Sequence, residues 1–140
     1  MRFTEHEMTT GVDAVARELF AATRPPWRRG STATAYDRLD RGQRYHRLAA
    51  AGEIVLPVLV ALPERPTVGA TPAFGAEEYA EAAAAAVREV HEHRSPGGWD
   101  ALGTRRRRAL VAVAARLTRT AVEAMPHRQD PDALVVPDHL

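Results

Sequence analysis

Apolar residues recur at helical spacing in four stretches of the chain, and polar residues occupy most positions between them. The first stretch shows this period at Met8, Val12, Val15, Ala16 and Leu19. Intervals of three and four residues are typical of an α-helix that buries one face. We expect this helix to begin after Thr4, because Glu7 would complete a capping box, and to end near Thr23, before two prolines.

The third stretch repeats the pattern of the first. Its apolar positions are Tyr79, Ala83, Ala86, Val87 and Val90. A loop follows each of these two helices, and after the loop comes an aromatic residue with a leucine three positions on, Tyr36 with Leu39 and Trp99 with Leu102. We interpret the two halves as an internal duplication of a helical hairpin, in which the aromatic residue and the leucine close the core at the hairpin end.

A further helix follows each aromatic pattern, with Asp40 and Thr104 as the expected N-caps. The helix after Asp40 is expected to bury Tyr45, Leu48, Ala49, Leu56 and Leu59. The helix after Thr104 is expected to bury Leu110, Val113, Ala114, Leu117, Ala121 and Met125. Both sets follow from the helical period alone.

Pro57 interrupts the pattern of the helix after Asp40. It lacks the N–H that would donate to the carbonyl of Glu53, so the sequence predicts a kink there, made easier by Gly52. An alternative ends the helix at Ala51 and makes residues 54–62 a buried strand, since this run is short and rich in branched side chains. We favour the kinked helix, because the sequence offers no second strand to pair with this one.

Together these patterns predict an all-α protein, an up-down four-helix bundle built from two similar hairpins. At 140 residues the chain, 1–140, has the length of a single domain. The expected parts are a first hairpin at 4–62, a proline-rich linker at 63–72, a second hairpin at 73–125 and an extended C-terminal tail at 126–140.

Composition narrows the class of protein further. The chain contains no cysteine, so it forms neither disulfides nor thiolate metal sites, which suits a reducing cytoplasm. Its longest strongly apolar run, residues 54–62, is too short to cross a bilayer. We therefore expect a soluble, cytoplasmic protein without a membrane partner.

The charges are unevenly placed, although the formal net charge is only +1 and all 19 basic residues are arginine. In an up-down bundle the two hairpin loops share one end. The segments 24–47 and 88–108 that would form this end hold 13 arginines against 5 acidic residues. Tryptophan lies among them, and tryptophan with arginine is typical of interfaces. The predicted partner-binding residues are Arg24, Trp27, Arg28, Arg29, Arg105, Arg106, Arg107 and Arg108.

The last four of these arginines occupy the first turn of the fourth helix, where positive charge opposes the helix dipole. Glu89 and Glu92 precede them on the neighbouring helix. We expect these two carboxylates to pair with Arg106 or Arg107 and so to offset part of the unfavourable charge.

No pattern of residues indicates a cofactor, and the histidines do not indicate a metal site. His91 and His93 lie two residues apart on a helix, so they point about 200° apart and do not share one ion. A second candidate site is a pocket near the Pro57 kink, for which Glu53 and His46 are the candidate residues.

The sequence therefore favours a non-enzymatic binding or adaptor protein that uses its basic, aromatic hairpin end to contact an anionic partner. A protein or a second copy of the chain is the favoured partner, with nucleic acid as an alternative.

The other hypothesis is a small-molecule-binding or catalytic pocket inside the bundle near Pro57 and Glu53. An ordinary solvated surface would also produce this charge pattern in an arginine-rich chain. A concave apolar pocket lined by Glu53 would favour the second hypothesis.

Overall fold

The computed structural model of the chain describes residues 1–65 and 72–126, apart from the side chains of residues 28–30. Within these ranges the chain is helical and contains no β-strand, which confirms the predicted all-α class. The long helices are α1 (Glu5–Thr23), α3 (Arg41–Ala61), α4 (Ala76–Arg94) and α6 (Thr104–Ala124). The short 3₁₀ helix η1 (Pro26–Ser31) and the helices α2 (Thr32–Asp37) and α5 (Gly98–Ala101) form the hairpin ends. The predicted extended tail, beyond Pro126, lies outside the described residues.

The helices begin where local capping patterns predict. The Glu7 N–H donates to Thr4 Oγ1 at 3.1 Å and the Thr4 N–H donates to Glu7 Oε1 at 2.7 Å, which confirms the capping box of α1. Asp40 caps α3 as predicted, because its side chain accepts a backbone N–H from the first turn. The prediction for α6 is wrong by one residue, since Gly103 is the N-cap and Thr104 begins the helix.

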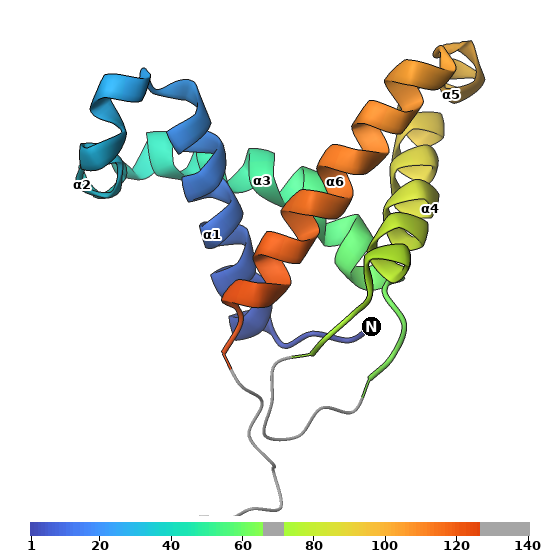
Figure 1. Cartoon of the computed structure of the whole chain (residues 1–140), viewed down its shortest axis with the longest axis horizontal. Helices are drawn as coiled ribbons and strands as arrows, with labels where there is room; N and C mark the ends of the chain where they lie inside the picture. The colour runs from blue at the N-terminus through green and yellow to red at the C-terminus, as the bar shows by residue number, and fades with distance from the viewer. Residues whose placement is uncertain (66–71, 127–140) are drawn as a thin grey trace, which may run out of the picture.

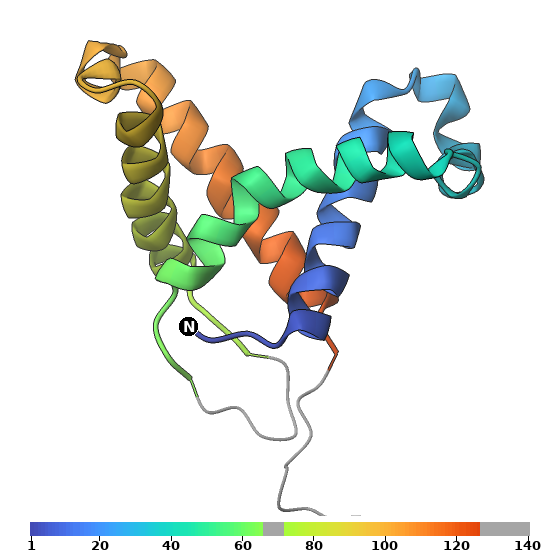
Figure 2. The ribbon, with the colours of Figure 1, turned by 180° about the vertical axis from the view of Figure 1, so that it is seen from behind.

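The four long helices cross one another. The helix α6 packs against α1 and α4, and α3 contacts all three. Figure 1 shows α3 passing behind α1 and α6, and Figure 2 shows the same crossing from the other side. The up-down four-helix bundle is therefore not confirmed, although the helices and their order are those expected.

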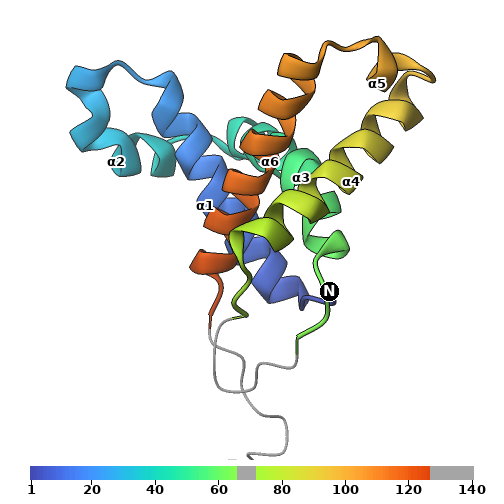
Figure 3. The ribbon, with the colours of Figure 1, turned by 45° about the vertical axis from the view of Figure 1, so that its right-hand side comes forward.

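The hairpin ends diverge from this crossing as the two arms of a V (Figure 1). Arm one comprises η1, α2 and the adjoining ends of α1 and α3. Arm two comprises α5 and the adjoining ends of α4 and α6. Figure 3, turned by 45°, shows the same separation of α2 from α5.

The core lies where the long helices cross. Its fully buried members include Val15, Val55, Leu59, Leu117 and Val122. Gly11 allows α1 to approach α6 closely, because a Cβ atom at this position would lie 3.0 Å from the carbonyl oxygen of Ala121. Tyr36 and Trp99 are buried in arm one and arm two. Tyr36 belongs to the core cluster, as predicted, whereas Trp99 lies outside that cluster and its ring packs against His91.

Several residues that the helical period assigned to the core are exposed instead. Tyr45 and Ala49 of α3 lie on the surface, and so do Leu56, Leu110 and Val113. These five predictions of burial are wrong for two reasons. Tyr45 and Ala49 lie where α3 extends past the crossing into arm one, and Leu56, Leu110 and Val113 line hollows beside α4 that no described helix covers. The buried face of α3 consists instead of Ala51, Gly52, Val55, Val58 and Leu59.

The segment around Pro57 is helical, since α3 continues through the proline to Ala61. The alternative of a buried strand at 54–62 is therefore wrong. The kink at Pro57 stays a prediction. Pro57 itself is half-buried and lies at the edge of a hollow between α3, α4 and α6.

Candidate functional site

A hollow with a volume of about 350 Å³ opens between α3, α4 and α6. Its walls combine apolar side chains with four polar ones. They are Glu53, Ile54 and Pro57 from α3, Ala86, Val87, Val90, His91 and Arg94 from α4, and Arg106, Ala109, Leu110, Val113 and Ala114 from α6. This volume lies at the lower end of the range found for small-molecule sites.

The apolar wall of the hollow explains why two of the predictions of burial were wrong. Leu110 and Val113 lie on the apolar stripe of α6, yet their side chains remain 38% and 45% exposed. Ala114, on the same stripe, is buried against neighbouring helices. The neighbouring helices thus cover only part of the apolar stripe of α6, and the uncovered part, with Leu110 and Val113, faces the hollow. Uncovered apolar surface of this kind is typical of binding sites.

Charged side chains stand at the rim of the hollow. Glu53 Oε2 lies 3.5 Å from Arg94 Nη2, and both side chains are largely exposed, so this ion pair links α3 to α4 at the surface. Arg106 is also exposed, and within the described part of the chain its side chain makes no ion pair or hydrogen bond. The rim therefore carries one paired and one unpaired cation.

A second, more open hollow lies beside the first between α3 and α4. The two share Glu53, Pro57, Ala86, Val90 and Arg94. The second adds Leu56 and Val60, which are 36% and 68% exposed. An uncovered apolar surface therefore continues from α6 across α4 to the last turns of α3.

His46 is not part of either hollow. It lies exposed on α3, two turns before Glu53, where its ring meets the edge of Tyr45 with 6.1 Å between centroids. Neither hollow has His46 among its lining residues. The prediction of a pocket containing both Glu53 and His46 is therefore corrected, because only Glu53 faces the apolar hollow.

In arm one, the predicted partner-binding residues have different roles. Trp27 is 82% exposed. Arg24 is half-buried, with its guanidinium 5.6 Å from the centroid of the Phe20 ring and Nη2 donating to Ser31 Oγ at 3.3 Å. Arg24 therefore stabilises the arm, whereas Trp27 is open to a partner. The side chains of Arg28 and Arg29 lie outside the described residues.

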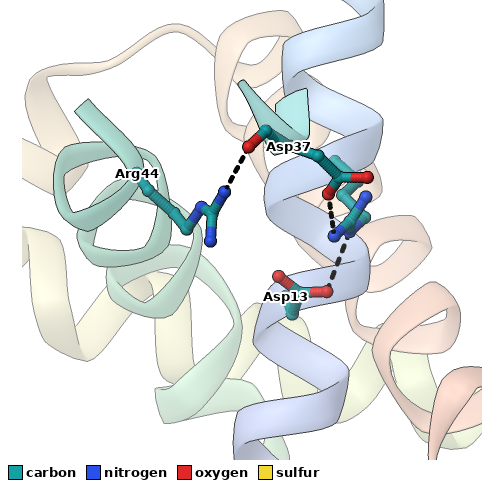
Figure 4. Close-up of polar contacts among 4 residues, drawn as sticks. Asp13, Asp37 and Arg44 are labelled. Atoms are coloured by element: carbon teal, nitrogen blue, oxygen red, sulfur yellow. Dashed lines mark hydrogen bonds and ion pairs between the residues drawn. The ribbon is translucent and has the colours of Figure 1, made fainter. Parts of the chain in front are cut away.

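Asp37 joins α1, α2 and α3 in arm one (Figure 4). Its Oδ1 accepts from Arg17 Nη2 of α1 at 2.9 Å, and its carbonyl oxygen accepts from Arg44 Nη2 of α3 at 2.8 Å. Arg17 also donates through Nε to Asp13 Oδ2 at 2.9 Å. These bonds fix α2 between α1 and α3, and so determine where Trp27 is presented.

In arm two, Arg105, Arg106 and Arg108 are exposed and Arg107 is half-buried. Arg107 Nε donates to the carbonyl oxygen of Leu102 at 3.0 Å, so this arginine helps to close the turn before α6. Four consecutive arginines therefore face water or the end of the preceding turn, at a helix start where positive charge is unfavourable.

The expected pairing of these arginines with Glu92 is not observed. The two oxygens of Glu92 accept the backbone N–H groups of Gly97 and Trp99, each at 3.0 Å. The bond from Gly97, followed by that from Trp99, holds the pKa of the Glu92 carboxyl below its ordinary value. Glu92 therefore caps the hairpin end of arm two. Glu89 is exposed at the second hollow.

The separation of the arms also corrects the predicted basic end. Arg24 and Trp27 belong to arm one, and residues 105–108 belong to arm two, on the other side of the V (Figures 1 and 3). The predicted binding residues thus lie on two separate arms, and the prediction of one shared surface is wrong because the helices cross instead of running side by side.

No family model, curated protein or solved structure matches the chain. In residues 1–65 and 72–126, no group of three or more acidic or histidine side chains is arranged to hold a metal ion. None of the helices in these ranges is long and apolar enough to cross a membrane. The proposals below therefore rest on the geometry of the hollow and of the two arms.

Proposed function

We propose that the chain is a binding protein that holds a small apolar ligand in the hollow between α3, α4 and α6. The observation that supports this most directly is the exposure of Leu110 and Val113 on an apolar stripe that should be covered. Covering these side chains with a ligand removes apolar surface from water, which contributes about 25 cal/mol for each Å² buried.

Binding fits the hollow better than catalysis does. Glu53 and Arg94 neutralise each other at its rim, in contact with water. The remaining walls are mainly aliphatic and alanine side chains, which offer contact area and exclude water. A general acid or base has to reach the reacting atoms of a bound substrate, and a carboxylate already paired at the surface is poorly placed for that role.

A neutral dye whose fluorescence rises in apolar surroundings, such as Nile red, tests this proposal. We expect the dye to bind the protein and Ala109→Trp to abolish binding, because Ala109 is an exposed residue that lines the hollow and the larger side chain would fill it. Ala112→Trp is the matched control, since Ala112 is exposed on the same helix but lines a different depression. Equal binding by wild type and Ala109→Trp would overturn the proposal, and so would loss of binding in Ala112→Trp alone.

A second candidate function has its own supporting observation, the 82% exposure of Trp27. The arms would contact an anionic partner, which is a protein, a second copy of this chain or a nucleic acid. In arm two, Arg105 and Arg108 extend into water from the first turn of α6. Such a role suits an adaptor protein, because two separate arms can engage two parts of a partner.

Titration of the protein with an acidic peptide and with single-stranded and duplex nucleic acid tests this second function. Binding through the arms should weaken steeply with salt and should fall in the double variant Arg105→Gln with Arg108→Gln. Arg116→Gln with Arg119→Gln is the control, because these arginines are exposed near the other end of α6. Sedimentation tests whether the partner is a second copy of the chain. This function would be ruled out if the protein bound neither the peptide nor nucleic acid, showed no dependence on salt and sedimented as a strict monomer.

Three other expectations from the sequence stay proposals. These are the internal duplication of the hairpin, the kink of α3 at Pro57 and the cytoplasmic location. The positions of Tyr36 and Trp99, each buried at a hairpin end, support the duplication. The cysteine-free composition supports a reducing compartment.

A further inference from the structure

The rim of the hollow has an unbalanced charge beside an apolar wall. Arg94 is engaged by Glu53, whereas the side chain of Arg106 has no ion pair or hydrogen bond with any described residue. Leu110 lies one helical turn from Arg106 on the same wall and is 38% exposed. A molecule lying along this wall would meet a cation at one end and hydrocarbon along the rest.

The position of Arg106 makes an anion favourable there. It is the third residue of α6, so its charge opposes the helix dipole and adds to the charges of Arg105, Arg107 and Arg108. Of the two expected counter-ions, Glu92 instead accepts two backbone N–H groups, and Glu89 forms no ion pair with a described residue. An acid group at the rim would therefore gain attraction that no described carboxylate supplies.

We propose that the ligand of the hollow is an amphiphilic acid, with an unbranched hydrocarbon chain against Val90, Leu110 and Val113 and a carboxylate bound by Arg106. This inference rests on the proposed ligand-binding function and specifies the class of ligand. Charge complementarity at Arg106 selects an acid over a neutral apolar molecule. The volume of about 350 Å³ suits a medium-length chain better than a long one.

Displacement of bound Nile red by straight-chain carboxylates and by the alcohols of equal length tests the inference. Within each series, affinity should rise about fourfold for each added methylene until the hollow is filled. At equal length and neutral pH, the carboxylate should bind about tenfold more tightly than the alcohol, as expected for a hydrogen bond to a charged group.

Arg106→Gln should remove this tenfold preference and leave the affinity for the alcohols unchanged. Arg105→Gln is the matched control, because Arg105 is the preceding exposed arginine and lines neither hollow. Arg106→Lys should restore part of the preference, since it restores the charge. Both arginines are exposed, so the variants should fold, and their helical circular dichroism and thermal melting would confirm this.

The outcomes separate the inference from the function on which it rests. If the dye does not bind, or binds equally well after Ala109→Trp, the proposed function fails. If the dye binds in the hollow but carboxylates and alcohols of equal length bind alike, only the amphiphilic acid is overturned. It is also overturned if Arg105→Gln and Arg106→Gln weaken carboxylates equally, which would indicate general attraction to a basic surface. Displacement of the dye by rising protein concentration alone would show that a second copy occupies the hollow instead.

Discussion

The guanidinium carbon of Arg17 lies 4.5 Å from the centroid of the Tyr36 ring. The ring is almost completely buried, and the edge of Phe20 meets it with 5.6 Å between centroids. The same guanidinium binds Asp13 of α1 and Asp37 of α2. Arg17 thus connects the polar surface of arm one to its aromatic centre and helps to hold α2 against α1.

We expect Arg17→Gln to lower the free energy of unfolding by about 1–2 kcal/mol, as the loss of one cation–π contact and two partly exposed ion pairs should. Urea unfolding measures the change. Arg119→Gln is the control, because the ion pair that Arg119 forms with a described residue is an exposed one, with Glu123 one turn away on α6. If Arg17→Gln lowers the free energy of unfolding no more than the control does, the contact with Tyr36 does not stabilise the arm.

Tyr36 provides a second test of the same contact. Its hydroxyl group makes no hydrogen bond with a described residue, so Tyr36→Phe should keep the stability of the wild type within about 1 kcal/mol. Tyr36→Ala should cost about 3–5 kcal/mol, because it leaves a cavity. A large loss in Tyr36→Phe would mean that the hydroxyl group, and not the ring, holds the arm together.

The two tryptophans should differ sharply in their effect on stability. Trp99 is 7% exposed and its ring packs against that of His91, so Trp99→Ala should destabilise the fold by about 3–5 kcal/mol. Trp27 is 82% exposed, and Trp27→Ala should change stability by less than about 0.5 kcal/mol. Urea unfolding followed by circular dichroism measures both. A similar loss in the two variants would contradict their different burial.

Glu92 should make the fold sensitive to acid. Its folded pKa is lowered by the N–H groups of Gly97 and Trp99, so its stabilisation is fully present above the ordinary value of 4.5 and is lost as pH falls through the lower folded value. Glu92→Gln should lower the melting temperature at neutral pH and show a smaller further loss on acidification. Glu89→Gln, one helical turn away and exposed, should melt like the wild type at neutral pH.

Tyr79 should make the fold sensitive to alkali. Burial raises the pKa of its hydroxyl group from 10 to about 12. Between these values the unfolded chain releases the proton and the folded chain keeps it, so stability should fall as pH rises from about 10 to 12. Urea unfolding at stepped alkaline pH should show this decline reduced in Tyr79→Phe, with the remainder attributable in part to Tyr36, whose pKa is also raised by burial. An unchanged decline in the variant would exclude Tyr79 as a cause.

The sequence alone determined the features of this protein that depend on residues close together in the chain. The capping box of Thr4 and Glu7 and the cap at Asp40 involve bonds within one turn, so the pattern of residue types was sufficient to predict them. The all-α class and the burial of Tyr36 and Trp99 follow for similar reasons, since a helical period with a large aromatic residue after each loop leaves few other arrangements.

Tertiary structure alone decided which apolar residues are covered and which charges lie together. The period of α6 shows that Leu110 and Val113 share a face with Ala114, but only the crossing of α3, α4 and α6 leaves the first two beside an open hollow. The separation of Trp27 from Arg106 likewise depends on the angles at which the helices cross. These angles result from contacts summed over several helices, such as the close approach at Gly11, and a residue's neighbours in the chain do not specify them.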